Sequence, residues 1–209
     1  MSRKCIAVID DDEAVRLSTS DLLQRLGFDV KLFKSGDAFL ESGSFEGIDC
    51  ILLDLQMPGR DGLAVLRALA ERDEPPPPAL VLTAHGGIPA AVEAIKLGAH
   101  DFMEKPYDVE VLLRKIEEAM QRPADTRGKA RANAEAAALI ETLSARQRQV
   151  LRGIVRGLQN KIIAYELGLS IRTVEAYRAQ LLDRLGARGT ADAVRVAIAA
   201  GFMDEPDPA

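Results

Sequence analysis

The chain of 209 residues has few cysteines and no long apolar segment. Its two cysteines, Cys5 and Cys50, do not form a Cys-x-x-Cys pair, which excludes a disulfide scaffold and a zinc ribbon and is typical of a reducing cytoplasm. No run approaches the roughly 18 to 20 apolar residues that span a membrane. The apolar run behind the basic N-terminus stops at Asp10, too early for a signal peptide. We therefore expect a soluble cytoplasmic protein with no membrane partner.

Aromatic residues are also scarce, and the composition is otherwise that of a globular protein. Six phenylalanines and three tyrosines offer no stacking platform, which argues against binding of single-stranded RNA. Hydrophobic residues make up 47% and charged residues 28%, which excludes a disordered chain. At roughly 150 residues per domain, the length predicts one large domain or two small ones.

The net charge of −5 is unevenly distributed along the chain. Residues 1–122 hold 14 Lys and Arg against 22 Asp and Glu, a net charge of −8. Residues 143–209 hold 10 against 7, a net charge of +3, and three of those seven acids lie in the last six residues. An acidic part joined to a basic part predicts two domains with different partners, the basic one suited to a polyanion.

Residues 1–122 alternate between two periods, which predicts a parallel sheet wrapped by helices. Short β-rich apolar runs recur at 5–9, 28–33, 50–53, 80–82 and 102–103. Stretches with helical spacing lie between them, and the first has an apolar face at Val15, Leu22, Leu23 and Leu26. Five β-α units buried on both faces indicate a flavodoxin-like, doubly wound (βα)5 fold of the α/β class.

A change of composition near residue 122 predicts a second, smaller domain. Pro123 ends the fifth helix, and residues 123–142 are polar and then alanine-rich, which predicts a partly helical linker. From Ser144 onward there are no strand signals and four helical stretches. Residues 143–209 are therefore predicted to form an all-α domain of four helices.

Acidic residues follow two predicted strands at the edge where ligands bind in such folds. The first strand runs into Asp10 and Asp11, and the third ends at Asp54. Three converging carboxylates repel one another unless a cation intervenes, and oxygen ligands with room for water suit Mg²⁺. Lys105 after the fifth strand supplies a second cation, and Thr83 at the end of the fourth offers a hydroxyl. Asp54 is then placed as a nucleophile that becomes an aspartyl phosphate.

Three other interpretations compete with this one. An Asp cluster after a strand is often only the N-cap region of a helix. Phosphatases of the haloacid dehalogenase type need a second Asp two residues after the nucleophile as general acid, and Gln56 stands there. A flavodoxin needs a hydroxyl-rich phosphate loop after the first strand, where this chain has four acids. Four features on four strand ends, in the right order, favour the phosphorylation site.

Residues 3–122 resemble the receiver domain of two-component response regulators. The motifs that carry the resemblance are Asp10-Asp11, Asp54 with Met57-Pro58-Gly59 and Asp61-Gly62, Thr83-Ala84, and Lys105-Pro106. In that family a sensor histidine kinase donates a phosphoryl group to the aspartate at the position of Asp54. The resemblance implies a phosphoprotein of a phosphorelay that removes its own phosphoryl group and is not a dedicated enzyme.

The resemblance also implies roles for individual residues. It implies Mg²⁺ held by Asp11, Asp54 and the backbone carbonyl of Gln56, with Asp10 acting through water. It implies a cis peptide bond before Pro106, and it identifies Phe102 as a rotating aromatic switch. Gln56 and His85 occupy positions that tune dephosphorylation in the family.

Residues 160–177 have the spacing of a helix-turn-helix. Gly168 can adopt the positive φ of the turn, and Ser170 is a good N-cap for the second helix. In a major groove, the exposed face of that helix offers cations to phosphates and small or acidic side chains to base edges. The predicted DNA contacts are Lys161, Arg172, Thr173, Glu175, Ala176, Arg178 and Ala179. The alternative is a generic helical bundle, since apolar periodicity alone predicts only a core.

Residues 143–202 resemble the DNA-binding domain of the FixJ, NarL and LuxR type. The motifs that carry this resemblance are Leu143-Ser144-x-Arg146, Gly157-Leu158-x-Asn160-Lys161-x-Ile163-Ala164, Thr173-Val174-Glu175 and Leu185-Gly186. The nearest subgroup is FixJ-type, from Arg172-Thr173-Val174-Glu175 and Tyr177-Arg178-Ala179. Two positions depart from the pattern: Gln147 stands where Glu is usual, and Tyr177 where His is usual.

Two functions of different classes follow from these observations. The first is a phosphorylation-controlled transcription regulator, in which a phosphoryl group on Asp54 promotes a homodimer or releases the C-terminal domain. The regulator then binds double-stranded promoter DNA and acts on RNA polymerase. The second is an interaction module whose basic helices dock a partner such as RNA polymerase without direct DNA binding. Groove binding releases counterions, so the salt dependence of binding to duplex DNA separates the two.

Overall fold

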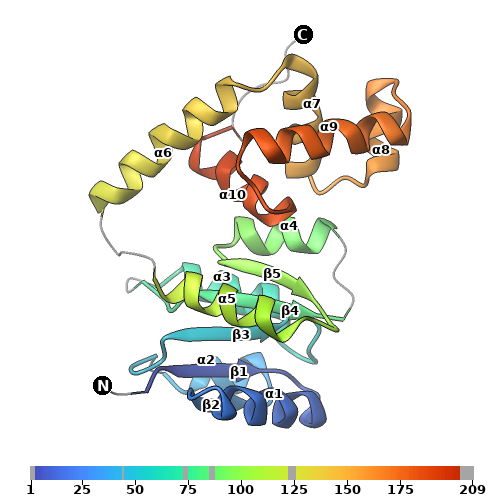
Figure 1. Ribbon diagram of the computed structural model, residues 1–209. Coiled ribbons are helices and arrows are strands. Elements are labelled where there is room, and N and C mark those ends of the chain that lie inside the picture. Colours follow the sequence, from blue (N-terminus) through green and yellow to red (C-terminus); the bar gives the residue numbers. More distant parts are fainter. Residues whose placement is uncertain (1–2, 44, 73–74, 85–87, 122–125, 203–209) are drawn as a thin grey trace. The chain divides into compact units, whose positions relative to one another are not determined.

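The computed structural model describes residues 3–43, 45–72, 75–84, 88–121 and 126–202 of the chain. The chain divides into two compact units, whose elements are labelled in Figure 1. The first unit comprises residues 1–86 and 97–122, and the second comprises residues 87–96 and 123–209.

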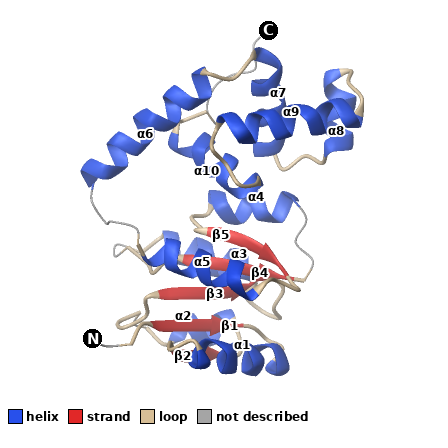
Figure 2. Cartoon of the chain, in the orientation of Figure 1, coloured by secondary structure: helices blue, strands red, loops and turns tan. Residues whose placement is uncertain are grey.

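The first unit is built on a five-stranded parallel sheet with the strand order β2-β1-β3-β4-β5 (Figure 2). Its strands are β1 (Cys5–Ile9), β2 (Asp29–Phe33), β3 (Cys50–Asp54), β4 (Ala79–Thr83) and β5 (Asp101–Glu104). This is the flavodoxin-like order, and it confirms the predicted fold class. Because β1 and β3 are neighbours, with Ile9 opposite Leu53, the residues that follow β1 lie beside the end of β3.

Helices alternate with these strands along the chain. They are α1 (Glu13–Arg25), α2 (Gly36–Glu41), α3 (Gly62–Ala70), α4 (Ile88–Lys96) and α5 (Val109–Met120). Every residue of β3 and of β4 is buried, as expected of a sheet covered on both faces. Alternate strand residues such as Ile6 and Leu52 share one core cluster with Leu23 of α1 and Ile116 of α5. Helices α1 and α5 therefore cover the same face of the sheet.

One detail of the first unit differs from the sequence prediction. On α1, the predicted apolar face included Leu26, but this side chain is 41% exposed. Thr19 and Ser20 are buried instead. An apolar pattern cannot predict this face, because polar residues contribute to it.

The C-terminal part of the second unit is entirely helical over the residues that the structure describes. Its helices are α6 (Thr126–Glu141), α7 (Ala145–Val155), α8 (Asn160–Leu167), α9 (Ile171–Arg184) and α10 (Thr190–Ala199). Leu143, Val150, Leu151, Val174 and Leu181 are almost fully buried in its core. This confirms the predicted all-α region. None of the described helices is long and apolar enough to cross a membrane.

Helix α6 occupies most of the segment 123–142 that was predicted to be only partly helical. Ala136 and Ile140 are buried, and α6 contacts α10. Two arginines bind carbonyl oxygens just after the helix: Arg184 Nη1 donates to Thr142 at 2.6 Å, and Arg148 Nε donates to Leu143 at 3.0 Å. Cationic donors at this end satisfy carbonyls that a helix terminus leaves unpaired. The end of α6 is thus an integral part of the second unit, while the predicted domain boundaries stay a prediction.

Gly62 at the start of α3 gives the first testable prediction. A Cβ atom at Gly62 would lie 2.4 Å from the carbonyl oxygen of Asp54 and 2.8 Å from the Cα of Leu55. These are backbone atoms, which cannot yield without moving the end of β3. We expect Gly62→Ala to lower the free energy of unfolding by about 1–3 kcal/mol, measured by urea unfolding.

The control for this experiment is Gly189→Ala. A Cβ atom at Gly189, the N-cap of α10, meets nothing within 4 Å, so the substitution should cost only what alanine costs as an N-cap, about 1 kcal/mol or less. Equal effects of the two substitutions would contradict the steric explanation.

Candidate functional site

Three carboxylates meet at the carboxyl ends of β1 and β3. Asp10 and Asp11 follow β1 directly, and Asp54 is the last residue of β3. One carboxylate oxygen from each residue lies within 4.8 Å of the others. Asp10 and Asp54 are buried, whereas Asp11 is exposed. The structure thus brings together the three acids predicted to converge, and these three residues are called the acidic cluster below.

The turn between β1 and α1 is fixed by local hydrogen bonds. The Asp12 side chain caps α1 by accepting from two N–H groups of its first turn. The N–H of Asp12 donates to Asp10 Oδ1 at 3.0 Å. One aspartate therefore starts the helix, which is the role expected of an N-cap, while Asp10 and Asp11 remain in the acidic cluster.

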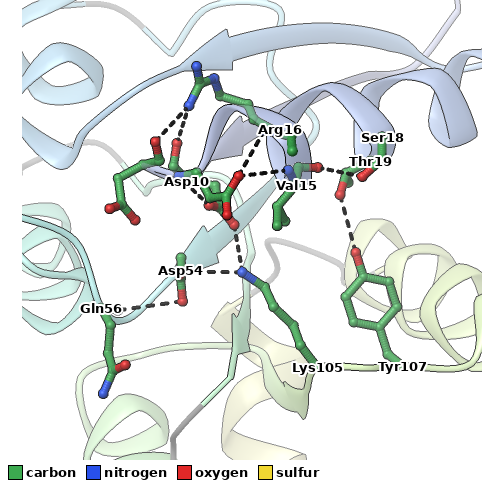
Figure 3. Close-up of polar contacts among 12 residues, drawn as sticks. Asp10, Val15, Arg16, Ser18, Thr19, Asp54, Gln56, Lys105 and Tyr107 are labelled. Carbon is green, nitrogen blue, oxygen red and sulfur yellow. Dashed lines mark hydrogen bonds and ion pairs between the residues drawn. The ribbon is translucent and has the colours of Figure 1, made fainter.

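Lys105 lies between the two buried acids (Figure 3). Its Nζ atom is 2.6 Å from Asp10 Oδ2 and 3.3 Å from Asp54 Oδ2. The N–H of Lys105 donates to the carbonyl oxygen of Thr83 at 2.8 Å, and Thr83 itself is fully buried. The peptide bond between Lys105 and Pro106 is cis, as the receiver resemblance implies. The end of β4 therefore fixes the segment that delivers the lysine.

Burial and charge act against each other at this site. Burial raises the pKa of Asp54, attraction to Lys105 opposes the rise, and repulsion from Asp10 adds to it. Burial alone would lower the pKa of Lys105, but its hydrogen bond to Asp10 and the attraction of Asp54 outweigh burial and raise it. Three carboxylates with one lysine leave the site short of positive charge, so a further cation is stabilised there.

The chemistry of these donors fits a hard metal ion. The acidic cluster supplies carboxylate oxygens from three residues, and the exposed Asp11 leaves one side open to water. Oxygen ligands combined with water are typical of Mg²⁺ and Ca²⁺ sites. The site can therefore hold a metal ion next to Asp54, a buried carboxylate suited to act as a nucleophile.

The other residues predicted for this site occupy different positions. The N–H of Gln56 donates to Asp54 Oδ1 at 3.4 Å, and the Gln56 side chain is exposed. Phe102 is half-buried on β5, opposite Val81 of β4. His85 lies outside the described residues.

Two residues beside the acidic cluster were not predicted from the sequence. Arg16 donates to the carbonyl oxygens of Asp10 and Asp11, and the Tyr107 hydroxyl lies 3.2 Å from Thr19 Oγ1. Neither belongs to a motif, because one binds main-chain atoms and the other binds a residue 88 positions away. The sequence signal that points to Tyr107 is the threonine on the inner face of α1, because a buried hydroxyl needs a polar partner.

Helices α8 and α9 form a helix-turn-helix, the second candidate site. Gly168 follows α8 with a φ of 64° in the left-handed region. Ser170 caps α9, its hydroxyl accepting from the N–H of Thr173 at 3.1 Å. Ile163 of α8 and Val174 of α9 are buried. The turn and the cap predicted from the sequence are confirmed.

The residues predicted to contact DNA divide into two groups. Exposed side chains are those of Lys161, Arg172, Glu175, Ala176 and Ala179. Thr173 and Arg178 are instead engaged within the unit. The Thr173 hydroxyl lies 2.7 Å from Ser170 Oγ, and Arg178 Nη2 donates to Thr190 Oγ1 at 2.8 Å. Burial also lowers the pKa of Arg178. Arg172 and Glu175 therefore present exposed charged groups on α9.

Gln147, which stands where Glu is usual, caps the start of α7. Its Oε1 accepts from the N–H of Ser144 at 2.9 Å, and its own N–H donates to Ser144 Oγ at 3.3 Å, which completes a capping box. Its Nε2 also donates to Gln180 Oε1 on α9 at 3.4 Å. A neutral amide thus links α7 to α9 without an ion pair.

Both parts of the chain match known families. Residues 6–117 match the response regulator receiver domain, and residues 141–197 match the bacterial regulatory proteins of the luxR family. Together the two matches cover most of the chain.

Individual relatives are similar over nearly the full length. The chain is 42% identical to the transcriptional regulatory protein FixJ of Bradyrhizobium diazoefficiens over 201 residues, which cover 96% of this chain and 97% of that protein. It is 39% identical to the response regulator protein TmoT of Ectopseudomonas mendocina, covering 91% of this chain and 86% of that one. The crystal structure of full-length FixJ from B. japonicum is similar with a TM-score of 0.55 and 40% identity, covering 98% of this chain and all of that chain.

The raised pKa of Asp54 gives a prediction on pH dependence. Folding raises this pKa, so the folded protein binds the proton more tightly than the unfolded chain does. The free energy of unfolding therefore falls as the pH rises through the pKa of Asp54 in the folded protein. We expect metal-free Asp54→Asn to be more stable than the unsubstituted protein at neutral pH. The difference should shrink as the pH falls toward the ordinary carboxyl range near pH ~4.

Urea unfolding in EDTA across this pH range measures the difference. Asp21→Asn is the matched control, since Asp21 forms an exposed ion pair with Arg25 on α1 and should show no such trend. A stability difference for Asp54→Asn that grows toward acid pH would contradict the assignment.

Proposed function

The chain belongs to the response regulators that join a receiver domain to a luxR-family helix-turn-helix domain, and we propose that it controls transcription through phosphorylation of Asp54. The observation that carries this proposal is the position of Asp54, buried at the end of β3 in the acidic cluster and 3.3 Å from Lys105. The proposed phosphoryl donor is a sensor histidine kinase. Both this donor and promoter DNA require the protein to act in the cytoplasm.

The proposed reaction is transfer of a phosphoryl group to Asp54. A carboxylate oxygen of Asp54 attacks the phosphorus of the kinase phosphohistidine, the P–N bond breaks, and the imidazole leaves. Asp11, Asp54 and the backbone carbonyl of Gln56 would hold Mg²⁺, with Asp10 acting through water, and the ion would offset the negative charge of the phosphoryl oxygens. Lys105 and Thr83 would bind those oxygens, and water would later release the group, so no substrate is turned over as by a dedicated enzyme.

The phosphoryl group would change the surface of the receiver. The phosphoryl group itself carries a charge of about −1.5 to −2, which draws the Lys105 ammonium and the Thr83 hydroxyl toward Asp54. Thr83 ends β4, and Phe102 lies on the adjacent strand β5. A shift of Thr83 would let the Phe102 ring turn inward and would remodel the surface formed by β5 and α5, which promotes a homodimer or releases the DNA-binding helices.

The proposed output is binding of double-stranded promoter DNA through α9. The exposed Arg172 would contact phosphates, and the exposed Glu175 would accept a hydrogen bond from a cytosine amino group in the major groove. A single small module has limited affinity, so two copies on paired half-sites are expected. From that position the dimer would act on RNA polymerase.

The central test compares the unsubstituted protein with Asp54→Asn, each with and without acetyl phosphate and Mg²⁺. We expect phosphorylation to raise the DNA affinity of the unsubstituted protein by about 5- to 150-fold, the usual range of such coupling, and to leave Asp54→Asn unchanged. Fluorescence anisotropy on promoter DNA measures the affinity, and Asp21→Asn serves as the control that should respond normally. Equal affinity in all conditions would refute the switch.

A second test separates the roles of the two exposed charges on α9. Arg172→Ala should weaken binding to all duplexes alike and reduce the slope of log affinity against log salt by about 1. Glu175→Ala should instead change base preference at one position. Arg146→Ala, an exposed arginine on α7, is the control. Uniform weakening by both α9 variants would contradict these roles, and salt-independent binding would favour the partner-docking module.

A further inference from the structure

We propose that α1 sets the geometry of the phosphorylation site from two points, Arg16 and Thr19. Arg16 holds the turn that carries Asp10 and Asp11, and Thr19 holds the segment that carries Lys105 through the hydroxyl of Tyr107. The inference rests on the proposed function, because it concerns the same site. Arg16 and Thr19 are positioning residues, since neither contacts a carboxylate of the acidic cluster.

The contacts of Arg16 point to a role beyond its charge. Its Nη1 donates to the carbonyl oxygen of Asp10 at 2.7 Å and to that of Asp11 at 3.3 Å, and the side chain is half-buried. A cation near the N-terminus of a helix is disfavoured by the helix dipole. The charge-assisted bonds to two consecutive carbonyls offset this and fix the orientation of both peptide units. The side chains of Asp10 and Asp11 project from those units into the acidic cluster.

The second point joins α1 to the other side of the site. Thr19 is 4% exposed, and its Oγ1 lies 3.2 Å from the Tyr107 hydroxyl (Figure 3). Tyr107 follows Lys105 by two residues, and the N–H of Lys105 is bound to Thr83 of β4. The segment from Lys105 to Tyr107 is therefore fixed at its start by β4 and at its end by α1. This explains why α1 buries a threonine where its apolar spacing suggested only aliphatic residues.

The two points share one rigid support. Arg16 and Thr19 are three residues apart, so they lie on the same side of α1. Through them, one helix sets where Asp10 and Asp11 stand relative to Lys105. Removing the hydrogen bonds of Arg16 should mainly displace the metal ligands Asp10 and Asp11. Removing the hydroxyl of Tyr107 should mainly displace Lys105.

Mg²⁺ binding distinguishes positioning by Arg16 from a simple charge effect, because the two predict opposite signs. If Arg16 acted only as a nearby cation, Arg16→Gln would tighten Mg²⁺ binding and Arg16→Lys would leave it unchanged. If it positions the ligands, both variants weaken Mg²⁺ binding by about tenfold or more, the usual effect of removing a partner that orients a metal ligand. Lysine keeps the charge but lacks the planar fork that reaches two carbonyls.

The dissociation constant for Mg²⁺ is measured on the full chain by isothermal titration calorimetry, with the unfolding midpoint in EDTA as a check on folding. Arg25→Gln is the matched control, an arginine on the exposed surface of the same helix, and it should bind Mg²⁺ as the unsubstituted protein does. Tighter binding by Arg16→Gln, or unchanged binding by Arg16→Lys, would overturn this half of the proposal.

The other half is tested with Tyr107→Phe and Thr19→Val. Each removes one hydroxyl of the pair, so each should slow phosphorylation by acetyl phosphate about three- to tenfold, the equivalent of one neutral hydrogen bond. The loss should persist at saturating Mg²⁺, and the double variant should lose no more than either single one. Ser18→Ala and Tyr165→Phe remove hydroxyls elsewhere and should not slow the reaction.

These results separate the inference from the function on which it rests. If the unsubstituted protein neither binds Mg²⁺ nor accepts a phosphoryl group, both fail. If it does both, and the Thr19 and Tyr107 variants react at its rate or their effects simply add, the Thr19–Tyr107 link alone is wrong. The proposal is supported if the Thr19 and Tyr107 variants react more slowly with effects that do not add in the double variant, and if both Arg16 variants bind Mg²⁺ more weakly.

Discussion

A shortage of positive charge beside two buried carboxylates is the constraint on which the proposed chemistry of the first unit depends. Asp10 and Asp54 are both buried, and their oxygens lie with those of Asp11 within 4.8 Å of one another. Lys105 contacts both buried acids but supplies a single positive charge. Burial raises the pKa of Asp54 despite the attraction of Lys105, and an added cation would stabilise the ionised carboxylates. The proposed metal and phosphoryl chemistry uses this shortage of positive charge.

The fold makes this convergence possible because parallel strands end at one edge of the sheet. The register of β1 against β3 sets Asp10 beside Asp54, and a backbone hydrogen bond from Lys105 to Thr83 sets the lysine beside both. Gly62 lets α3 begin directly against the backbone of Asp54, where no side chain fits. Helix α1 adds a support on the outside of the sheet. The acids are thus held by main-chain contacts more than by one another.

The second unit has a neutral interior and carries its charged side chains on the surface. Its helices bury an apolar core and a neutral capping glutamine, Gln147, while Arg172 and Glu175 remain exposed on α9. Arg178, by contrast, is engaged with Thr190 near the start of α10. A charged residue on a predicted recognition face is therefore not automatically a DNA contact. The acidic cluster and the helix-turn-helix lie in different units, so the net negative and the net positive charge are kept in separate parts of the chain.

The sequence by itself determined the strands, the acids at their ends, the lysine, the glycine turn and the cap of the helix-turn-helix. These follow from local periods and from residue types whose chemistry does not depend on distant partners. The tertiary structure decided the rest: the burial of Thr19, its contact with Tyr107, the exposure of Leu26 and the engagement of Arg178. Each of these depends on which side chain a remote segment brings alongside, and packing sets that, not the pattern of the residue's own helix.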